Sequence, residues 1–262
     1  MALALDKKRI PGPAKSFVPL LEPGSLTQQP FTPEKRQDGR SAHQIRPFFS
    51  KIGAIKQANG SAYIEFGNLK VTCSVYGPRQ GKTKTADRGQ LNCDFKFAPF
   101  SCSRRRGYPK DPVEKEFGIL IKQALSPAVR FETFPKSTVD IFVYVIESDG
   151  TASCLAAAIT CASLALADAG IEIKDLVVAS SAGFFGEQIV LDCSTKEESL
   201  QTGSLTLSFM PSLNEVTHVL QSGEVAPEAA FQGMELCVDA CSKIRPVLDQ
   251  TLAGQYEHRT SI

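Results

Sequence analysis

The sequence has no strong excess of charge of either sign, and this limits the ligands that it can attract as a whole. Its 262 residues include 29 Lys and Arg and 28 Asp and Glu, which gives a formal net charge of +1. A chain this close to neutral does not attract nucleic acid through its bulk charge. Any contact with RNA would have to come from a local cluster of basic residues.

Motifs that would identify a metal site or a nucleophilic enzyme are also missing. The sequence contains no CxxC pair, no P-loop, no GxSxG and no HExxH. His43, His218 and His258 do not have the spacing of metal ligands. The eight cysteines lie mostly in apolar runs, which is typical of reduced, buried thiols in an intracellular protein. We therefore expect no metal site, no cofactor and no disulfide.

Ala152–Ala169 is a long apolar run at the lower margin of the length that spans a membrane. It is rich in alanine, includes Ser and Thr, and lies between two predicted strands. These features predict a helix buried in the protein, with no membrane partner. The N-terminal MALALDKKRIPG holds an apolar run too short for a signal peptide, so none is expected.

The stretch from Thr138 to Gly183 predicts the unit around which the rest of the chain is organised. Val139–Ile146 is rich in β-branched and aromatic residues and predicts a strand. Ser148-Asp149-Gly150 predicts a turn before the apolar helix, and Leu176–Ser180 begins another strand. This order predicts a βαβ unit with a right-handed crossover.

The turn between the first strand and the helix is a suitable place for a phosphate group. A helix N-terminus attracts anions, and enzymes that use phosphate add a cation there. The turn from Glu147 to Leu155 contains two acidic residues and neither Arg nor Lys. The sequence therefore predicts that this turn lacks the cation of a phosphate site.

The rest of the chain predicts one domain with an extension at each end. We expect a flexible N-terminal arm at 1–32, a domain at 33–252 and a C-terminal tail at 253–262. The domain is predicted to be α/β (α+β), with two mixed-sheet and helix halves at about 33–170 and 171–252. The other expected strands are Gly53–Ile55, Gly60–Phe66, Leu69–Tyr76, Leu91–Phe97, Gln188–Asp192, Gly203–Met210 and Asn214–Leu220, and the other expected helices begin at Asp111 and run from Pro227 to Leu252.

Two groups of basic residues require an interpretation. Arg104, Arg105 and Arg106 follow one another in a loop, which suits either a clamp on a phosphate backbone or an ordinary solvated loop. Arg36-Gln-Asp-Gly-Arg40 contains a turn signal and is followed by Arg46. We expect the arginines of this second group to bind carboxylates or an adjoining subunit.

Several of these segments in combination resemble the RNase PH-like family. They are R-x-D-G-R with the I-R-P that follows, GSAYIEFGNLKV, VYGPR, KQALSPAV, VDIFVYVIESDG and SLALADAGIEIKDLV. They extend from about Pro33 to Leu252, and within the family they look most like the mRNA-transport-regulator type of ring subunit in the eukaryotic RNA exosome. The resemblance implies an RNase PH-like fold of the ribosomal protein S5 domain 2-like kind.

The resemblance also implies partners and a role in RNA processing and degradation. Subunits of this family pair into dimers, and three dimers close a six-membered ring to which S1/KH-type cap subunits bind. Single-stranded RNA passes through the ring toward an associated catalytic exoribonuclease, in the nucleus, the nucleolus and the cytoplasm. By the same resemblance, Arg79, Arg104, Arg105 and Arg106 are candidates for contacts with the RNA backbone in the channel.

The resemblance further implies that the phosphate site has degenerated. Active members carry a Gly-Gly-Thr-Arg motif before the buried helix, where the helix start and the arginine bind the attacking phosphate. Counting back from SLALADAG places Leu155 at the arginine and Cys154 at the hydroxyl before it, with Ser153 preceding them. Leucine offers neither a charge nor a donor to the phosphate.

A second catalytic feature is also incomplete. Active members place two acidic residues after the strand that ends here at Asp192. Glu197 or Glu198 could supply the first acid, but Gly203 and Ser204 stand where the second is expected. We therefore interpret Glu197 and Glu198 as surface charges and the chain as a non-catalytic ring subunit.

Two alternatives remain open at this point. The first is a phosphorolytic 3′-5′ exoribonuclease that has rebuilt its phosphate site, with Lys96 or the Arg104–Arg106 run supplying a cation near Cys154. The second is a purely structural interaction subunit that does not contact RNA.

Overall fold

The computed structural model describes residues 36, 38–80, 88–102, 105–106, 111–186 and 188–260. The main compact unit of the chain begins at Pro33. The expected arm at 1–32 and Arg104 lie outside the described residues.

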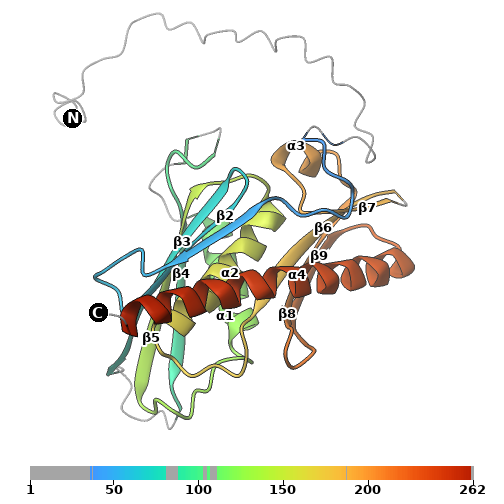
Figure 1. The fold of residues 1–262 in the computed structure, drawn as a ribbon. Coiled ribbons are helices and arrows are strands. Elements are labelled where there is room, and N and C mark those ends of the chain that lie inside the picture. The colour runs from blue at the N-terminus through green and yellow to red at the C-terminus, as the bar shows by residue number, and fades with distance from the viewer. Residues whose placement is uncertain are drawn as a thin grey trace, which may run out of the picture. The chain divides into compact units, whose positions relative to one another are not determined.

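The first sheet has five strands in the order β1-β2-β3-β5-β4 (Figure 1). Its strands are β1 (Phe48–Ile52), β2 (Gly60–Phe66), β3 (Leu69–Gln80), β4 (Gln90–Phe97) and β5 (Ser137–Glu147). In β5, buried Val and Ile alternate with residues that are half-buried or exposed, as in a strand with one covered face. Gly67 begins the two-residue turn between β2 and β3 with a φ of 55°, which glycine adopts without a steric penalty.

In the first sheet, two of the predicted strands have a boundary that differs from the structure by more than two residues. Gly53–Ile55 is not a strand; the sheet instead starts with β1, which pairs with β2 up to Ile52. Gly53 has a φ of 69° and leaves the β region, so the strand ends before it. At the other end, β3 continues past Tyr76 to Gln80, and Arg79 pairs with Thr138 after a shift in register.

The βαβ unit is not the one that the sequence predicts. The parallel strands β4 and β5 are connected through α1 (Pro112–Leu125), so the unit is β4-α1-β5. The predicted unit from Val139–Ile146 onward is wrong, because β5 and β6 (Val178–Phe185) lie in different sheets. The helix between them, α2 (Thr151–Asp168), contacts β2 and β3 of the first sheet and β6 and β8 of the second. Contact on two sides explains why α2 is apolar on nearly every face.

The second sheet has four strands in the order β7-β6-β8-β9, with β7 (Gln188–Leu191), β8 (Gly203–Met210) and β9 (Glu215–Gly223). A short helix, α3 (Thr195–Glu198), follows β7. The last helix, α4 (Pro227–Thr260), packs on β6 and β8 and crosses to β1 (Figure 1). It extends beyond the predicted end at Leu252, so residues 253–260 continue the helix rather than forming a separate tail.

The few polar side chains of α2 bind the backbone of neighbouring strands. Thr160 Oγ1 accepts a hydrogen bond from the Ala179 amide at 3.0 Å, and Ser163 Oγ accepts one from the Val177 amide at 2.8 Å. By length and composition, α2 is the one helix in the described residues that could cross a membrane, but 83% of it is buried inside the protein. A mostly buried core helix satisfies the same criterion, and the bonds to Val177 and Ala179 give its hydroxyls a role in such a core.

Candidate functional site

The N-terminus of α2 is held by side chains from α3. Gly150, with a φ of 91°, turns the chain from β5 into the helix. The Gly150 amide donates a 2.8 Å hydrogen bond to Thr195 Oγ1. The Thr151 amide donates a 2.6 Å hydrogen bond to Glu198 Oε2. A carboxylate of the chain itself thus occupies a position at the helix start that suits an anion.

The three residues of the expected degenerate phosphate site face the interior. Ser153 Oγ donates to the Cys193 carbonyl at 2.9 Å and lies 3.1 Å from Ser181 Oγ. Cys154 and Leu155 are 0% and 1% exposed, and both belong to the hydrophobic core. Leu155 is therefore a residue of the hydrophobic core.

Cys154 also cannot supply a reactive thiolate. Burial raises the pKa of its thiol to about 12, and the nearby Arg106 guanidinium, which acts in the opposite direction, does not reverse this. A thiol with such a pKa stays protonated at neutral pH.

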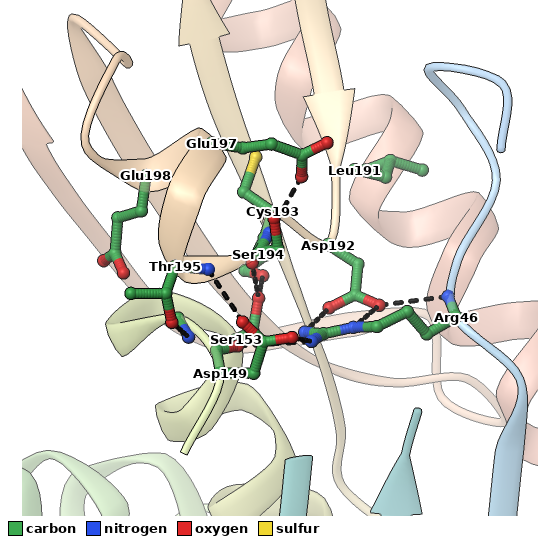
Figure 2. Close-up of polar contacts among 12 residues, drawn as sticks. Arg46, Asp149, Ser153, Leu191, Asp192, Cys193, Ser194, Thr195, Glu197 and Glu198 are labelled. Carbon is green, nitrogen blue, oxygen red and sulfur yellow. Dashed lines mark hydrogen bonds and ion pairs between the residues drawn. The ribbon is translucent and has the colours of Figure 1, made fainter. Parts of the chain in front are cut away.

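Arg46 joins the loop after β7 to the turn before α2. Figure 2 shows its guanidinium extended between the carboxylates of Asp192 and Asp149. Arg46 Nε lies 2.8 Å from Asp192 Oδ2, the Arg46 amide donates to the same oxygen at 3.0 Å, and Nη1 lies 2.9 Å from Asp149 Oδ2. The other oxygen of Asp149 accepts a 2.8 Å bond from the Thr195 amide.

A second buried arginine neutralises Glu197. Arg36 Nε and Nη2 reach the two oxygens of Glu197 at 2.8 and 2.7 Å, and the Ser194 amide donates to Glu197 at 2.8 Å. Glu197 is only 4% exposed, so its interpretation as a surface charge is wrong. It is buried because a bidentate guanidinium satisfies both oxygens. Glu198 is half-buried and bound to Thr151.

Each carboxylate of this site therefore has a donor from the same chain. In the part of the chain that the structure describes, no buried side-chain nitrogen or oxygen lacks a hydrogen-bond partner. The same part contains no group of three or more His, Cys, Asp or Glu that could hold a metal ion. The arginines that organise the site come from the R-x-D-G-R and I-R-P segments, for which the sequence predicted binding to carboxylates or to an adjoining subunit.

The candidate RNA-binding residues do not come together. Arg79 pairs with Thr138 at the start of β5. Arg105 and Arg106 follow β4, whose last residue, Phe97, pairs with Val145 near the other end of β5. At about 3.3 Å per residue, the seven steps from Thr138 to Val145 span about 23 Å. Arg79 and the Arg105–Arg106 loop thus lie at opposite ends of the first sheet.

Each end has an exposed arginine, and Arg106 differs from both because it is paired. Arg79 is exposed and lies 5.0 Å from the centre of the Tyr76 ring. Arg105 is exposed. Arg106 binds Asp111 at 2.9 Å and stacks 3.8 Å from the centre of the Phe97 ring. The guanidinium of Arg106 is therefore paired with the residue that precedes α1 and stabilises the start of that helix.

Comparison with known proteins agrees with this architecture. The model of the 3′ exoribonuclease family, domain 1, matches residues 44–172, and that of domain 2 matches residues 175–240. Exosome complex component MTR3 of Homo sapiens is 38% identical over 272 residues, with 97% of each chain covered. Exosome complex component RRP41-like of Arabidopsis thaliana is 42% identical over 219 residues, which cover 83% of this chain and 84% of that one.

A solved structure shows the same fold. Rrp46 of rice (Oryza sativa) superimposes with a TM-score of 0.73 at 27% identity, over 83% of this chain and 100% of that chain. The two matched domains correspond to the two sheets with their helices. The chain therefore belongs to the 3′ exoribonuclease, or RNase PH, family and has an RNase PH-like fold.

Proposed function

We propose that this chain is a non-catalytic subunit of the RNA exosome ring. In this role it helps to build the six-membered RNase PH-like core and to guide single-stranded RNA for 3′-5′ processing and degradation. The relatives described as exosome complex components support the assembly. The internal pairing of the site supports the absence of catalysis.

The observation that carries the proposal is the carboxylate of Glu198 on the Thr151 amide. An attacking phosphate would have to displace this carboxylate and would find no arginine at Leu155, which lies in the core. A phosphate dianion beside a carboxylate is strongly disfavoured unless a cation neutralises it, and the Leu155 side chain offers none. Glu197 is likewise held by Arg36 and is not free to act as an acid catalyst.

The phosphorolytic alternative needs a cation near Cys154. Arg106 is close enough to influence the pKa of Cys154, but it is bound to Asp111. Recruiting it would break this ion pair and its contact with Phe97. The ion pair of Arg106 therefore supports the non-catalytic role.

Incubation of the purified chain with RNA and inorganic phosphate tests this proposal. We expect no release of nucleoside diphosphates. A parallel reaction with sulfate in place of phosphate is the control, because a contaminating hydrolase releases monophosphates in both reactions. Diphosphates that form only with phosphate would show that the chain is a phosphorolytic enzyme.

The proposed partners are other RNase PH-like subunits within the ring, S1/KH-type cap subunits and an associated catalytic exoribonuclease. The proposed location is the nucleus and nucleolus, and also the cytoplasm. Native mass spectrometry of the chain with its partners tests the assembly, and we expect a hetero-oligomer rather than a monomer.

The role in guiding RNA is tested in the reconstituted ring. We expect Arg79→Glu and Arg105→Glu together to shorten the length of RNA that the ring protects from nuclease, while the ring stays assembled. Unchanged protection, with no RNA crosslinks to this chain, would favour the purely structural alternative.

A further inference from the structure

Three separate segments form a pocket at the end of the first sheet where Arg79 lies. The Gly89 amide donates to the Phe131 carbonyl at 3.0 Å, the Lys174 amide donates to the Ala128 carbonyl at 2.7 Å, and the Arg130 amide donates to the Glu172 carbonyl at 3.0 Å. These backbone bonds fix 88–90, 126–134 and 172–174 against one another.

The packing beneath this pocket is close. A Cβ at Gly89 would lie 2.2 Å from the Phe134 ring, so the backbone beside Arg88 rests directly on a buried aromatic side chain. The framework is therefore rigid enough to present side chains in a fixed arrangement.

The pocket has a volume of about 410 Å³, and Arg88, Arg130 and Lys174 line it together with Phe131 and the acidic Glu132. All three cations are exposed. Arg130 lies 3.9 Å from Glu172 in an exposed ion pair, which contributes little and leaves the guanidinium available. Among the described residues, no ion pair involves Arg88 or Lys174. The lining thus carries three positive charges against one negative charge.

The other end of the molecule has the opposite character. There, Asp149, Asp192, Glu197 and Glu198 are bound internally, and Arg106 is paired with Asp111. At that end Arg105 is exposed, whereas Arg88, Arg130 and Lys174 bring three exposed cations together at one pocket. Arg79 adds to this positive charge, because Arg79 and Gln90 both pair with Thr138, on either side of β5.

We propose that Arg88, Arg130 and Lys174 form a binding site for the phosphate backbone of single-stranded RNA, separate from the degenerate phosphate site. Guanidinium and ammonium groups around an open pocket bind phosphates without reading bases. Phe131 supplies one aromatic wall, which suits a base stacked beside the backbone. This proposal depends on the proposed function in one respect only, which is that RNA passes along this chain.

The test compares two triple variants of the full chain. The site variant is Arg88→Ala with Arg130→Ala and Lys174→Ala. The matched control removes three exposed lysines elsewhere, with Lys51→Ala on β1, Lys115→Ala on α1 and Lys243→Ala on α4. Both variants change the net charge by the same amount. Equal melting temperatures for the two variants and the wild type confirm that folding is intact.

Fluorescence anisotropy measures the binding of an oligouridine of about twelve nucleotides at several salt concentrations. Each phosphate contact with a single strand contributes about 0.7 to the slope of log K against log salt. We expect the site variant to reduce the slope by about 2 and the control to leave it unchanged. When the salt concentration rises from 50 to 200 mM, the affinity of the wild type for the oligouridine should therefore fall about 20-fold more than that of the site variant.

Competition with other anions identifies the ligand. We expect inorganic phosphate and polyglutamate, at equal charge concentration, to displace the oligouridine poorly from the wild type. Displacement by phosphate would indicate a site for single phosphates, and displacement by polyglutamate would indicate an acidic protein segment; either result overturns the RNA assignment.

The assignment is also overturned if the wild type does not bind the oligouridine, or if the site variant and the control lose the same slope. Release of nucleoside diphosphates is measured in a separate reaction. A result that contradicts the non-catalytic proposal can therefore be distinguished from one that contradicts RNA binding at this pocket.

Discussion

Replacing Asp192 with Asn removes one charge from the buried contact that joins the loop after β7 to Arg46. Asp192 is 5% exposed and has a φ of 52°. Asparagine has nearly the same shape and tolerates this left-handed conformation. The substitution therefore removes the charge and one acceptor oxygen, with no change in side-chain size or backbone strain.

The expected cost follows from what remains around Arg46. Its guanidinium loses a carboxylate that binds it through both oxygens, and it keeps Asp149 at 2.9 Å. Removing one partner of a buried ion pair costs about 3 to 5 kcal/mol, because the other charge stays buried. We expect Asp192→Asn to lower the free energy of unfolding by about 3 kcal/mol, the lower end of that range, since Asp149 still compensates part of the charge.

The pH dependence gives a second check with a definite sign. Burial alone would raise the pKa of Asp192, but the hydrogen bonds and the charge of Arg46 outweigh it and lower the pKa below its ordinary value. A carboxyl with a lowered pKa contributes stability that is complete above its unfolded pKa, about 3.9. That stability is lost as the pH falls through the folded pKa, so the difference between wild type and Asp192→Asn should shrink below about pH 4.

Urea unfolding of both proteins from pH 7 to pH 3 measures these differences. The double variant Asp192→Asn with Arg46→Met is the control, because removing both charges should recover much of the lost stability. A loss below about 1 kcal/mol at pH 7, or a loss that does not depend on pH, would refute the electrostatic reasoning.

Two further predictions concern packing and thiol accessibility. A Cβ at Gly60 would lie 2.5 Å from the Ala165 carbonyl oxygen, whereas one at Gly254 meets nothing within 4 Å. In urea unfolding, Gly60→Ala should therefore lower the free energy of unfolding by about 3 kcal/mol. Gly254→Ala, within α4, should raise it by about 0.5 kcal/mol. Thiol labelling at pH 8 should modify about one cysteine rapidly. Six of the eight cysteines are buried, and burial raises the pKa of the half-buried Cys93 to about 12. Cys102→Ser should remove the rapid phase, and several rapidly labelled cysteines would contradict the burial.

The elements that the sequence predicts well are those set by local pattern. The strand around Val139–Ile146 and the apolar helix after it are both present, because alternation and length alone define them. The Asp111-Pro112 start of α1 is also present, with the Asp111 side chain accepting from the Val113 amide at 3.1 Å. These signals lie within a few residues of the element that they define.

The arrangement of the sheets could not be read in the same way. A strand, a helix and another strand in succession usually return to one sheet. Here α2 is apolar on both sides and separates β5 from β6. Period and composition do not distinguish a helix that covers one sheet from a helix that lies between two, because both are buried.

The internal pairing of the candidate site was only partly predictable. The sequence indicated that the arginines of R-x-D-G-R and I-R-P bind carboxylates or an adjoining subunit, but it did not indicate which carboxylates. Arg36 and Glu197 are 161 positions apart, and no local signal marks Glu197 as buried. The fold brings the two segments together, and only then does a polar loop prove to be an ordered, neutralised cluster.

Leu155→Arg tests whether the proposed absence of catalysis depends on a single residue. By resemblance, this change restores the missing cation, but Leu155 is 1% exposed and lies in the core. An unpaired charge there should cost at least about 4 kcal/mol. Thr151→Arg is the matched control, because Thr151 is exposed at the start of the same helix and should change stability by only about 0.5 kcal/mol.

We expect neither variant to release nucleoside diphosphates with phosphate, because Glu198 still occupies the helix start. If Leu155→Arg keeps the unfolding free energy of the wild type and becomes phosphorolytic, Leu155 is only a vacant position in an otherwise intact active site. If it unfolds while Thr151→Arg stays folded and inactive, Leu155 is required by the core, and a single substitution cannot provide a phosphate site there.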